Sequence, residues 1–172
     1  MSLIEQIMVL AIVAILTGIA APPLHRVLSH NRLQVAQTDF IAALQHARAT
    51  AATSGRRTLF CPSVDGRHCS KGSRWDGGWL LGQDANGDHQ PDHLPSYSGS
   101  AYNSGVRIIS SAGRHDVRFG PEGGARGSNL TLLFCLPGAN EPVLSVVVSN
   151  SGRIRGAVAT ATQTKTCLQQ TD

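Results

Sequence analysis

The chain has 172 residues, of which 41% are hydrophobic and 15% charged, and a formal net charge of +4. This length suits one globular domain with an appendage, and the mild positive charge permits an anionic partner without requiring one. The sequence holds no nucleophile elbow, phosphate-binding loop or H-E-x-x-H motif, and we expect no enzyme activity and no cofactor.

The first predicted element is one long helix over residues 1–52. Its first part, residues 1–21, is apolar on every face, which suits lipid or the centre of a helical bundle. At ~1.5 Å per residue this part approaches the ~30 Å hydrocarbon thickness of a membrane, so a transmembrane first half is expected. Pro22 and Pro23 are expected to break or bend the helix, because a proline ring replaces an amide donor.

The second part of the helix, residues 24–52, has apolar residues at amphipathic spacing with polar residues between them. This pattern predicts that one helix face lies on a globular domain. Ser54 and Gly55 are expected to end the helix, which leaves residues 53–172 for that domain.

Short strands and turns dominate the rest of the chain, which predicts an α+β fold with the long helix packed on an antiparallel sheet. Residues 83–105 are the longest stretch without a strand signal and are expected to form a surface loop. Trp75 and Trp79 are expected to pack beneath the sheet; stacking on nucleic-acid bases is the alternative. The predicted strands are residues 58–61, 79–82, 106–110, 116–119, 130–136 and 143–149, with a further candidate at 152–160.

The four cysteines form no C-x-x-C pair and match no histidine pattern, which argues against a metal site. An even count behind an apolar helix suggests disulfides in an oxidising compartment. Three pairings are possible, and four buried free thiols are the alternative. We favour Cys61–Cys69, which closes a short loop, and Cys135–Cys167, which ties the C-terminal tail to a strand.

Asp84, Asn86 and Asp88 place oxygen atoms at alternate positions, with Asp92 beyond them, like the start of a calcium loop. His89 stands where such a loop needs glycine, and no glutamate closes the pattern. A turn built by Asx side chains explains the same residues. We therefore favour the turn and expect no metal.

Glu5 is the only charged side chain before Arg26. A carboxylate at the centre of a membrane helix costs roughly 2.5–3.5 kcal/mol, and less near an end, so it needs a partner. The free α-amino group of a neighbouring subunit is one such partner; a place among lipid headgroups is the alternative.

The segment from Ser2 to Glu5, followed by an aliphatic helix and Pro22, resembles the N-terminus of mature type IV pilins and type II secretion pseudopilins. The resemblance implies that Met1 takes the N-methylated first position, where that family usually has phenylalanine. It implies that Glu5 pairs with the N-terminus of an adjacent subunit during assembly with other major and minor pilins. It also implies an inner-membrane protein with a periplasmic domain before assembly, and an extracellular pilus after it.

Motifs of the predicted domain resemble the GspH/FimT family of minor pilins and pseudopilins, and the likeness covers most of the chain. They comprise Leu59-Phe60-Cys61-Pro62-Ser63, Asp65-Gly66, Cys69, Trp75, Gly78-Trp79, Asp84, Asn86 and Asp88, then Phe119-Gly120-Pro121, Cys135 and residues 146–155.

Gly152-Arg153-Ile154-Arg155 is the sharpest candidate site. In extended backbone the two arginines share one face and Ile154 turns to the core. Guanidinium groups ~6.6 Å apart, twice the strand rise, can bridge neighbouring phosphates. Spacing alone favours two solvated arginines.

In the FimT branch, a Gly-Arg-x-Arg motif near the C-terminus is associated with binding DNA during natural transformation. The resemblance therefore implies extracellular DNA as a partner, bound through its phosphate backbone without base specificity. Arg114, Arg118 and Arg126 are weaker candidates that would extend the basic patch. The alternative is a GspH-like pseudopilin or minor pilin with a purely structural role in type II secretion or type IV pili.

Overall fold

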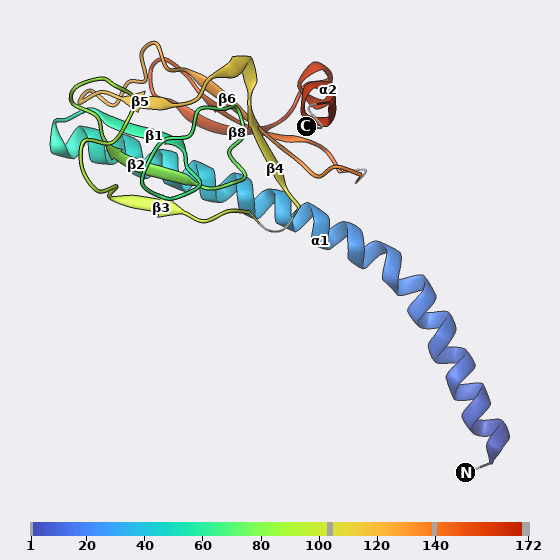
Figure 1. The fold of residues 1–172 in the computed structure, drawn as a ribbon. Coiled ribbons are helices and arrows are strands. Elements are labelled where there is room, and N and C mark those ends of the chain that lie inside the picture. The colour runs from blue at the N-terminus through green and yellow to red at the C-terminus, as the bar shows by residue number, and fades with distance from the viewer. Residues whose placement is uncertain (1, 103–104, 139–140, 170–172) are drawn as a thin grey trace.

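A computed structural model describes residues 2–102, 105–138 and 141–169, without the side chains of residues 17–26 and 112. Figure 1 shows a long helix that carries a β-rich domain on its C-terminal half, with the N-terminal half extending away from the domain. The described elements are α1 (Leu3–Ser54), β1 (Thr58–Pro62), β2 (Trp79–Gln83), β3 (Tyr97–Gly99), β4 (Arg107–Ser110), η1 (Ser111–Gly113), β5 (Val117–Phe119), β6 (Leu130–Cys135), β7 (Leu144–Val148), β8 (Ile154–Val158) and α2 (Ala161–Gln169).

The long helix α1 is continuous and passes Pro22 and Pro23 without a break. It curves along its length (Figure 1), as the prolines led us to expect. It ends at Ser54, where Gly55 adopts the left-handed conformation at φ 66°, which confirms the predicted stop.

Among the described side chains of the N-terminal half of α1, none belongs to the domain core, and apolar ones such as Leu3 (74%) and Ile4 (76%) are exposed. The transmembrane first half expected over residues 1–21 lies partly outside the described side chains and stays a prediction. Among the described residues, hydropathy identifies no helical stretch with the length and apolar character of a membrane span.

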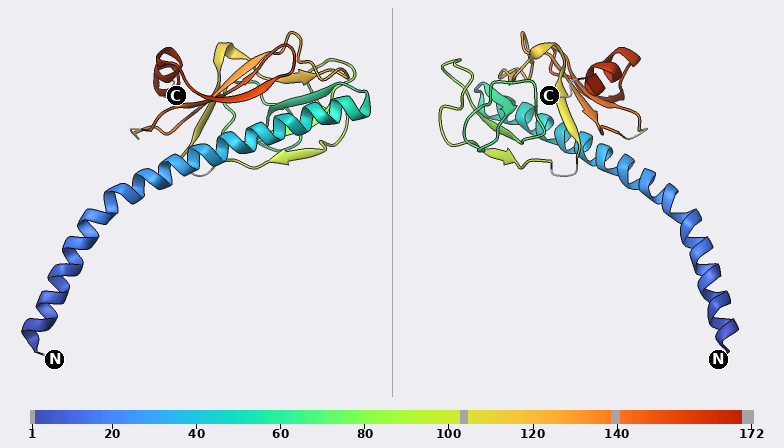
Figure 2. Two further views of the ribbon diagram at one scale, coloured as in Figure 1. Left: turned by 180° about the vertical axis from the view of Figure 1, so that it is seen from behind. Right: turned by 45° about the vertical axis from the view of Figure 1, so that its right-hand side comes forward.

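The domain contains two four-stranded antiparallel sheets, which confirms the α+β prediction. One has the strand order β3-β2-β1-β5 and the other β4-β6-β7-β8. The C-terminal half of helix α1 runs alongside the two sheets (Figure 2) and contacts strands of each. Strand β8 is the outer strand of its sheet and pairs with β7, so that Arg155 lies opposite Val147.

The main core lies between α1 and the two sheets. Phe40 of α1 is at its centre, with ring contacts to Phe60 (centroids 6.0 Å apart), Trp75 (6.2 Å) and Phe134 (5.4 Å). Trp75 is fully buried, and Trp79 packs against the same cluster while remaining half-buried. The prediction that both tryptophans belong to the core is confirmed.

Both predicted disulfides are present, and each closes a smaller apolar cluster. Cys61–Cys69 joins β1 to the following loop, over a cluster that includes Leu59. Cys135–Cys167 joins β6 to α2 beside Leu133. The cysteines are therefore structural, as expected.

Besides the single turn of η1, two elements were missed, and several boundaries differ. Strand β3 lies inside residues 83–105, which the sequence predicted to be a loop, and α2 had no predicted counterpart. The seven predicted strands all exist, with ends that differ from the prediction by one or two residues.

Candidate nucleic-acid interface

The hairpin between β7 and β8 presents the Gly-Arg-x-Arg motif. The Ser149 N–H donates to the Arg153 carbonyl at 3.0 Å, and the Gly152 N–H donates to the Ser149 carbonyl at 2.8 Å. The Ser149–Arg153 hydrogen bond encloses a loop of three residues, 150–152, whose last residue, Gly152, has φ +77°. A three-residue hairpin loop that ends in a left-handed glycine is a common way to join antiparallel strands.

Gly152 is buried, and its environment leaves no room for a side chain. A Cβ atom there would overlap the carbonyl oxygen of Gly123 and would lie 3.3 Å from the Cα of Gly124. Its positive φ also favours glycine. The glycine of the motif therefore shapes the turn, while the arginines on either side of Ile154 face solvent.

Arg153 precedes β8 and Arg155 lies within it, and both side chains are exposed. Ile154 between them is half-buried and packs against the main core. Within the described part of the chain, neither guanidinium group has an ion pair or hydrogen bond to the protein. The two arginines therefore lie at the start of the outer strand of the sheet, with their charges available to an anion.

The serines near the motif are engaged in the turn. Ser149 Oγ accepts a hydrogen bond from the Arg153 N–H at 3.1 Å and lies 2.9 Å from Ser151 Oγ. Their hydroxyl groups hold the backbone that carries Arg153.

Loop 120–129 lies against this hairpin. The Ala125 N–H donates to the Asn150 carbonyl at 3.0 Å, and Gly123 touches Gly152 as described above. Arg126, which follows Ala125, is exposed. The structure therefore brings Arg126 to the same end of the domain as the hairpin.

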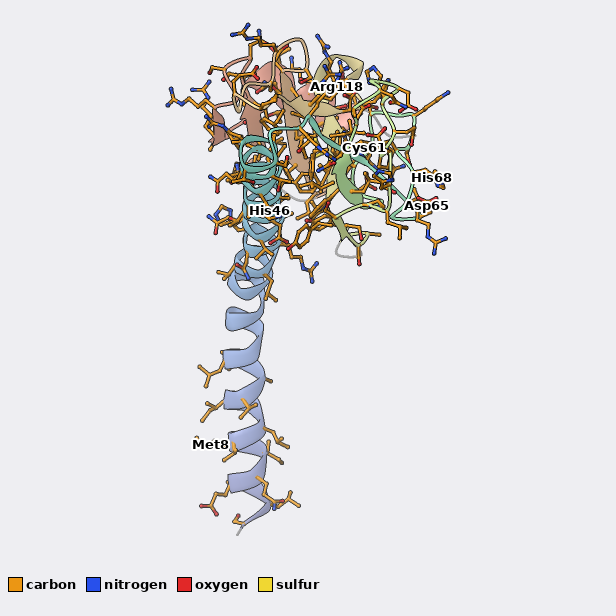
Figure 3. The ribbon with its side chains drawn as sticks, turned by 90° about the vertical axis from the view of Figure 1, so that its left-hand side faces the viewer. Met8, His46, Cys61, Asp65, His68 and Arg118 are labelled. Carbon is orange, nitrogen blue, oxygen red and sulfur yellow. A yellow bond between two sulfur atoms is a disulfide. The ribbon has the colours of Figure 1, made fainter. Side chains whose placement is uncertain are left out.

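Arg114 and Arg118 are more constrained than Arg126. Arg114 Nη1 donates to the Gly127 carbonyl at 2.8 Å. Arg118 Nε lies 3.0 Å from Asp116 Oδ2 in an ion pair, and its side chain is 27% exposed. Figure 3 places Arg118 at the end of the domain remote from Met8. Because Asp116 offsets its charge, Arg118 adds less to the positive surface than the sequence suggested.

Glu5 takes part in the N-terminal cap of α1. The Ser2 N–H donates to a Glu5 carboxylate oxygen at 3.4 Å in a capping-box arrangement. The S-x-x-E spacing could have indicated this in the sequence. Met1 and its proposed methylation lie outside the described residues.

The loop with Asp84 is a network of turns. The Gly87 N–H donates to Asp84 Oδ1 at 2.7 Å, the Gln90 N–H donates to Asp88 Oδ1 at 2.9 Å, and the Ala85 N–H donates to Asp92 Oδ2 at 2.7 Å. The turn interpretation is therefore confirmed. In the part of the chain that the structure describes, no group of three or more His, Cys, Asp or Glu side chains is placed to hold a metal ion.

A groove of about 490 Å³ lies between α1 and the β2–β3 edge, with Asp39, Trp79, Tyr97 and Tyr102 among its lining residues. Burial, reinforced by the negative charge of Asp39, raises the pKa of Tyr102 to about 12. The groove therefore presents a neutral phenol at ordinary pH, beside one carboxylate and aromatic rings. It is separate from the arginine hairpin and shares no residue with it.

Asp65 and His68 form an exposed pair within the loop closed by Cys61–Cys69. His68 Nδ1 lies 2.7 Å from Asp65 Oδ2, and the Arg67 and His68 N–H groups donate to Asp65 Oδ1. These hydrogen bonds, first that of the His68 ring, hold the pKa of Asp65 well below its usual range. Every one of these bonds stays within the loop, so the pair serves to hold its shape.

Comparison with known proteins points to one group. A family model described as "Type II transport protein GspH" matches residues 36–152. The type IV minor pilin FimU of Pseudomonas aeruginosa superposes with a TM-score of 0.61 at 19% identity, covering 77% of this chain and 91% of FimU. The minor pseudopilin EpsH of the Vibrio cholerae type 2 secretion system gives 0.53 at 15%, covering 74% and 97%. At such identities the two likenesses show a shared fold. A comparison with curated protein sequences found no match.

Proposed function

The chain belongs to the GspH family of type II transport proteins, and from that premise we propose that it is a minor type IV pilin of the FimT kind. It enters the pilus through α1 and binds extracellular DNA through Arg153 and Arg155, for uptake in natural transformation. The observation that carries the DNA-binding part is the pair of exposed arginines on a hairpin that fixes their backbone.

The assembly part of the proposal rests on the N-terminal half of α1. The apolar side chains described there are exposed in the single chain, and they include Val9 (52%) and Leu16 (61%). Such a surface is stable in contact with lipid or with the helices of other subunits. We propose that it contacts the inner membrane before assembly and the filament core afterwards, with Glu5 meeting the N-terminus of a neighbouring pilin.

The DNA-binding part rests on geometry and charge. Strand alternation directs Arg153 and Arg155 to one side, and neither charge is offset by an acid among the described residues. Guanidinium groups bind phosphate oxygens with paired N–H donors. Contacts of this kind are made to the backbone of DNA, so binding is expected to be insensitive to sequence and strongly dependent on salt.

The test is DNA binding by the 172-residue chain in detergent micelles, measured by fluorescence anisotropy on a labelled duplex over a range of salt. Arg153→Gln/Arg155→Gln removes two charges from the hairpin. Arg32→Gln/Arg67→Gln, at two exposed arginines elsewhere, is the control that removes the same charge. Because two arginines no longer neutralise phosphates, the slope of log K against log salt should fall by about 1.8. Equal slopes for the two double variants would refute the proposed site.

A purely structural role in a pilus or a type II secretion filament is the second candidate. The description of the matching family as a transport protein favours it. A purely structural role predicts that the chain incorporates into filaments and has no measurable affinity for DNA at roughly 50 mM to 200 mM salt, a range over which the affinity of phosphate-binding proteins for DNA falls strongly.

A further inference from the structure

We propose that Arg48 of α1 is a third phosphate-binding residue of the DNA surface, held against the hairpin by Gly123. This inference rests on the proposed function and adds a residue of the long helix to a site whose predicted residues all lie in the β-rich domain. Arg48 is exposed and lies near the C-terminal end of α1.

The contact between Arg48 and Gly123 is close. A Cβ atom on Gly123 would lie 3.1 Å from Arg48 Nε, 3.6 Å from its Cγ and 3.7 Å from its Nη2. The stem and the guanidinium group of Arg48 therefore lie along the backbone of Gly123. Gly123 has φ +73°, a conformation that also favours glycine. Because glycine has no side chain, Arg48 can lie directly on this backbone.

Gly123 also connects Arg48 to the Gly-Arg-x-Arg motif. Its carbonyl oxygen touches Gly152, the residue before Arg153, and the neighbouring Ala125 N–H bonds to Asn150 in the same hairpin. A single glycine thus lies in contact with both Arg48 and the turn that carries Arg153. Residues that are far apart in the sequence meet at one end of the domain.

The charge of Arg48 is available to a ligand. Among the described residues it has no ion pair with a carboxylate and no hydrogen bond to the protein. The acid of this loop, Glu122, places its carboxylate against Gly120 and Gly124 instead, with Oε1 at 3.3 Å from a Cβ on Gly124. Arg48 also lies in helix α1, so the backbone that carries its charge is rigid.

The experiment compares Arg48→Gln with Arg32→Gln, another exposed arginine of α1, in the full chain in detergent micelles. Removing one phosphate-binding charge should lower the salt slope by about 0.9, which between 50 mM and 200 mM salt is roughly a threefold change in relative affinity. Arg32→Gln should leave the slope unchanged. Arg48→Lys keeps the charge and should retain most of the slope.

Each result decides the question. If Arg48→Gln and Arg32→Gln have the same slope while Arg153→Gln/Arg155→Gln lowers it, the inference is wrong and the proposed function stands. If none of these variants changes the slope, the proposed function itself fails. If Arg48→Lys weakens binding as much as Arg48→Gln does, Arg48 acts by packing on Gly123 and the inference is overturned.

Discussion

Replacing Gly152 with alanine tests whether the hairpin is held by its contact with Gly123. The residue has φ +77°, a conformation that costs an L-residue roughly 1–2 kcal/mol. The added Cβ would also overlap the Gly123 carbonyl, and forced rearrangement in a packed site typically costs about 1–3 kcal/mol. The expected loss of folding free energy is therefore about 3 kcal/mol, or roughly 6–12 °C in Tm for a chain of this size.

Gly127 provides a matched control. Its φ is +75°, nearly the same as that of Gly152, and nothing lies within 4 Å of a Cβ atom built there. Gly127→Ala should therefore lose only the backbone term of roughly 1–2 kcal/mol.

The assay is thermal unfolding of both variants followed by circular dichroism, with DNA binding measured at a temperature where each is folded. Gly152→Ala should lower Tm more than Gly127→Ala and should alone weaken DNA binding. Equal losses of Tm would refute the claim that contact between the two loops positions the arginines.

Other parts of the molecule give three further predictions. Cys135→Ser removes a disulfide that closes a loop of 32 residues and should lower the free energy of unfolding by about 4 kcal/mol, whereas Cys61→Ser removes one that closes a loop of 8 and should lower it by about 2.5 kcal/mol. Chemical denaturation measures both losses, and a larger loss for Cys61→Ser would contradict the prediction. Tyr102 should ionise near pH 12 in an absorbance titration, and Tyr102→Phe should abolish that phase. Because the pKa of Tyr102 is raised in the folded state, the contribution of its neutral phenol to folding stability is complete below about pH 10 and is lost as the pH rises towards 12. A Tyr102→Phe variant that loses as much stability between these two pH values as the wild type does would contradict this. Glu5→Ala should reduce incorporation into filaments and leave the Tm of the domain unchanged, because the hydrogen bonds described for Glu5 lie within the first turn of α1. Normal incorporation of this variant would exclude an assembly role for Glu5.

The elements that the sequence predicted are those with a strong local signal. The end of α1 was readable because Gly55 is the residue type that left-handed helix caps require. Buried strands such as β6 and β7 were readable from runs of branched apolar residues. The pairing of Cys135 with Cys167 was predicted because it ties the C-terminal tail to a strand.

The elements that were missed depend on contacts that no local pattern carries. Strand β3 has only three residues, Tyr97–Gly99, none of them buried, so it had no apolar alternation to detect. Helix α2 has three threonines in nine residues, which are weak helix formers, and one buried anchor, Cys167, that the disulfide holds on β6.

The candidate site divides in the same way. Exposure of Arg153 and Arg155 on either side of Ile154 was predictable from strand alternation. The role of Gly152 was not, because it depends on Gly123, which is distant in the sequence. For the same reason nothing in the sequence linked Arg48 to the motif.

The central claim is that one subunit both enters the filament and carries the DNA-binding arginines. It is tested most directly in the source organism, by replacing the native gene with the Arg153→Gln/Arg155→Gln variant and measuring uptake of labelled DNA alongside the amount of this subunit in sheared pili. The account predicts a normal amount of the subunit in pili and a loss of DNA uptake that the Arg32→Gln/Arg67→Gln control does not show. Uptake equal to that of the wild type, with the variant present in the pili, would contradict it.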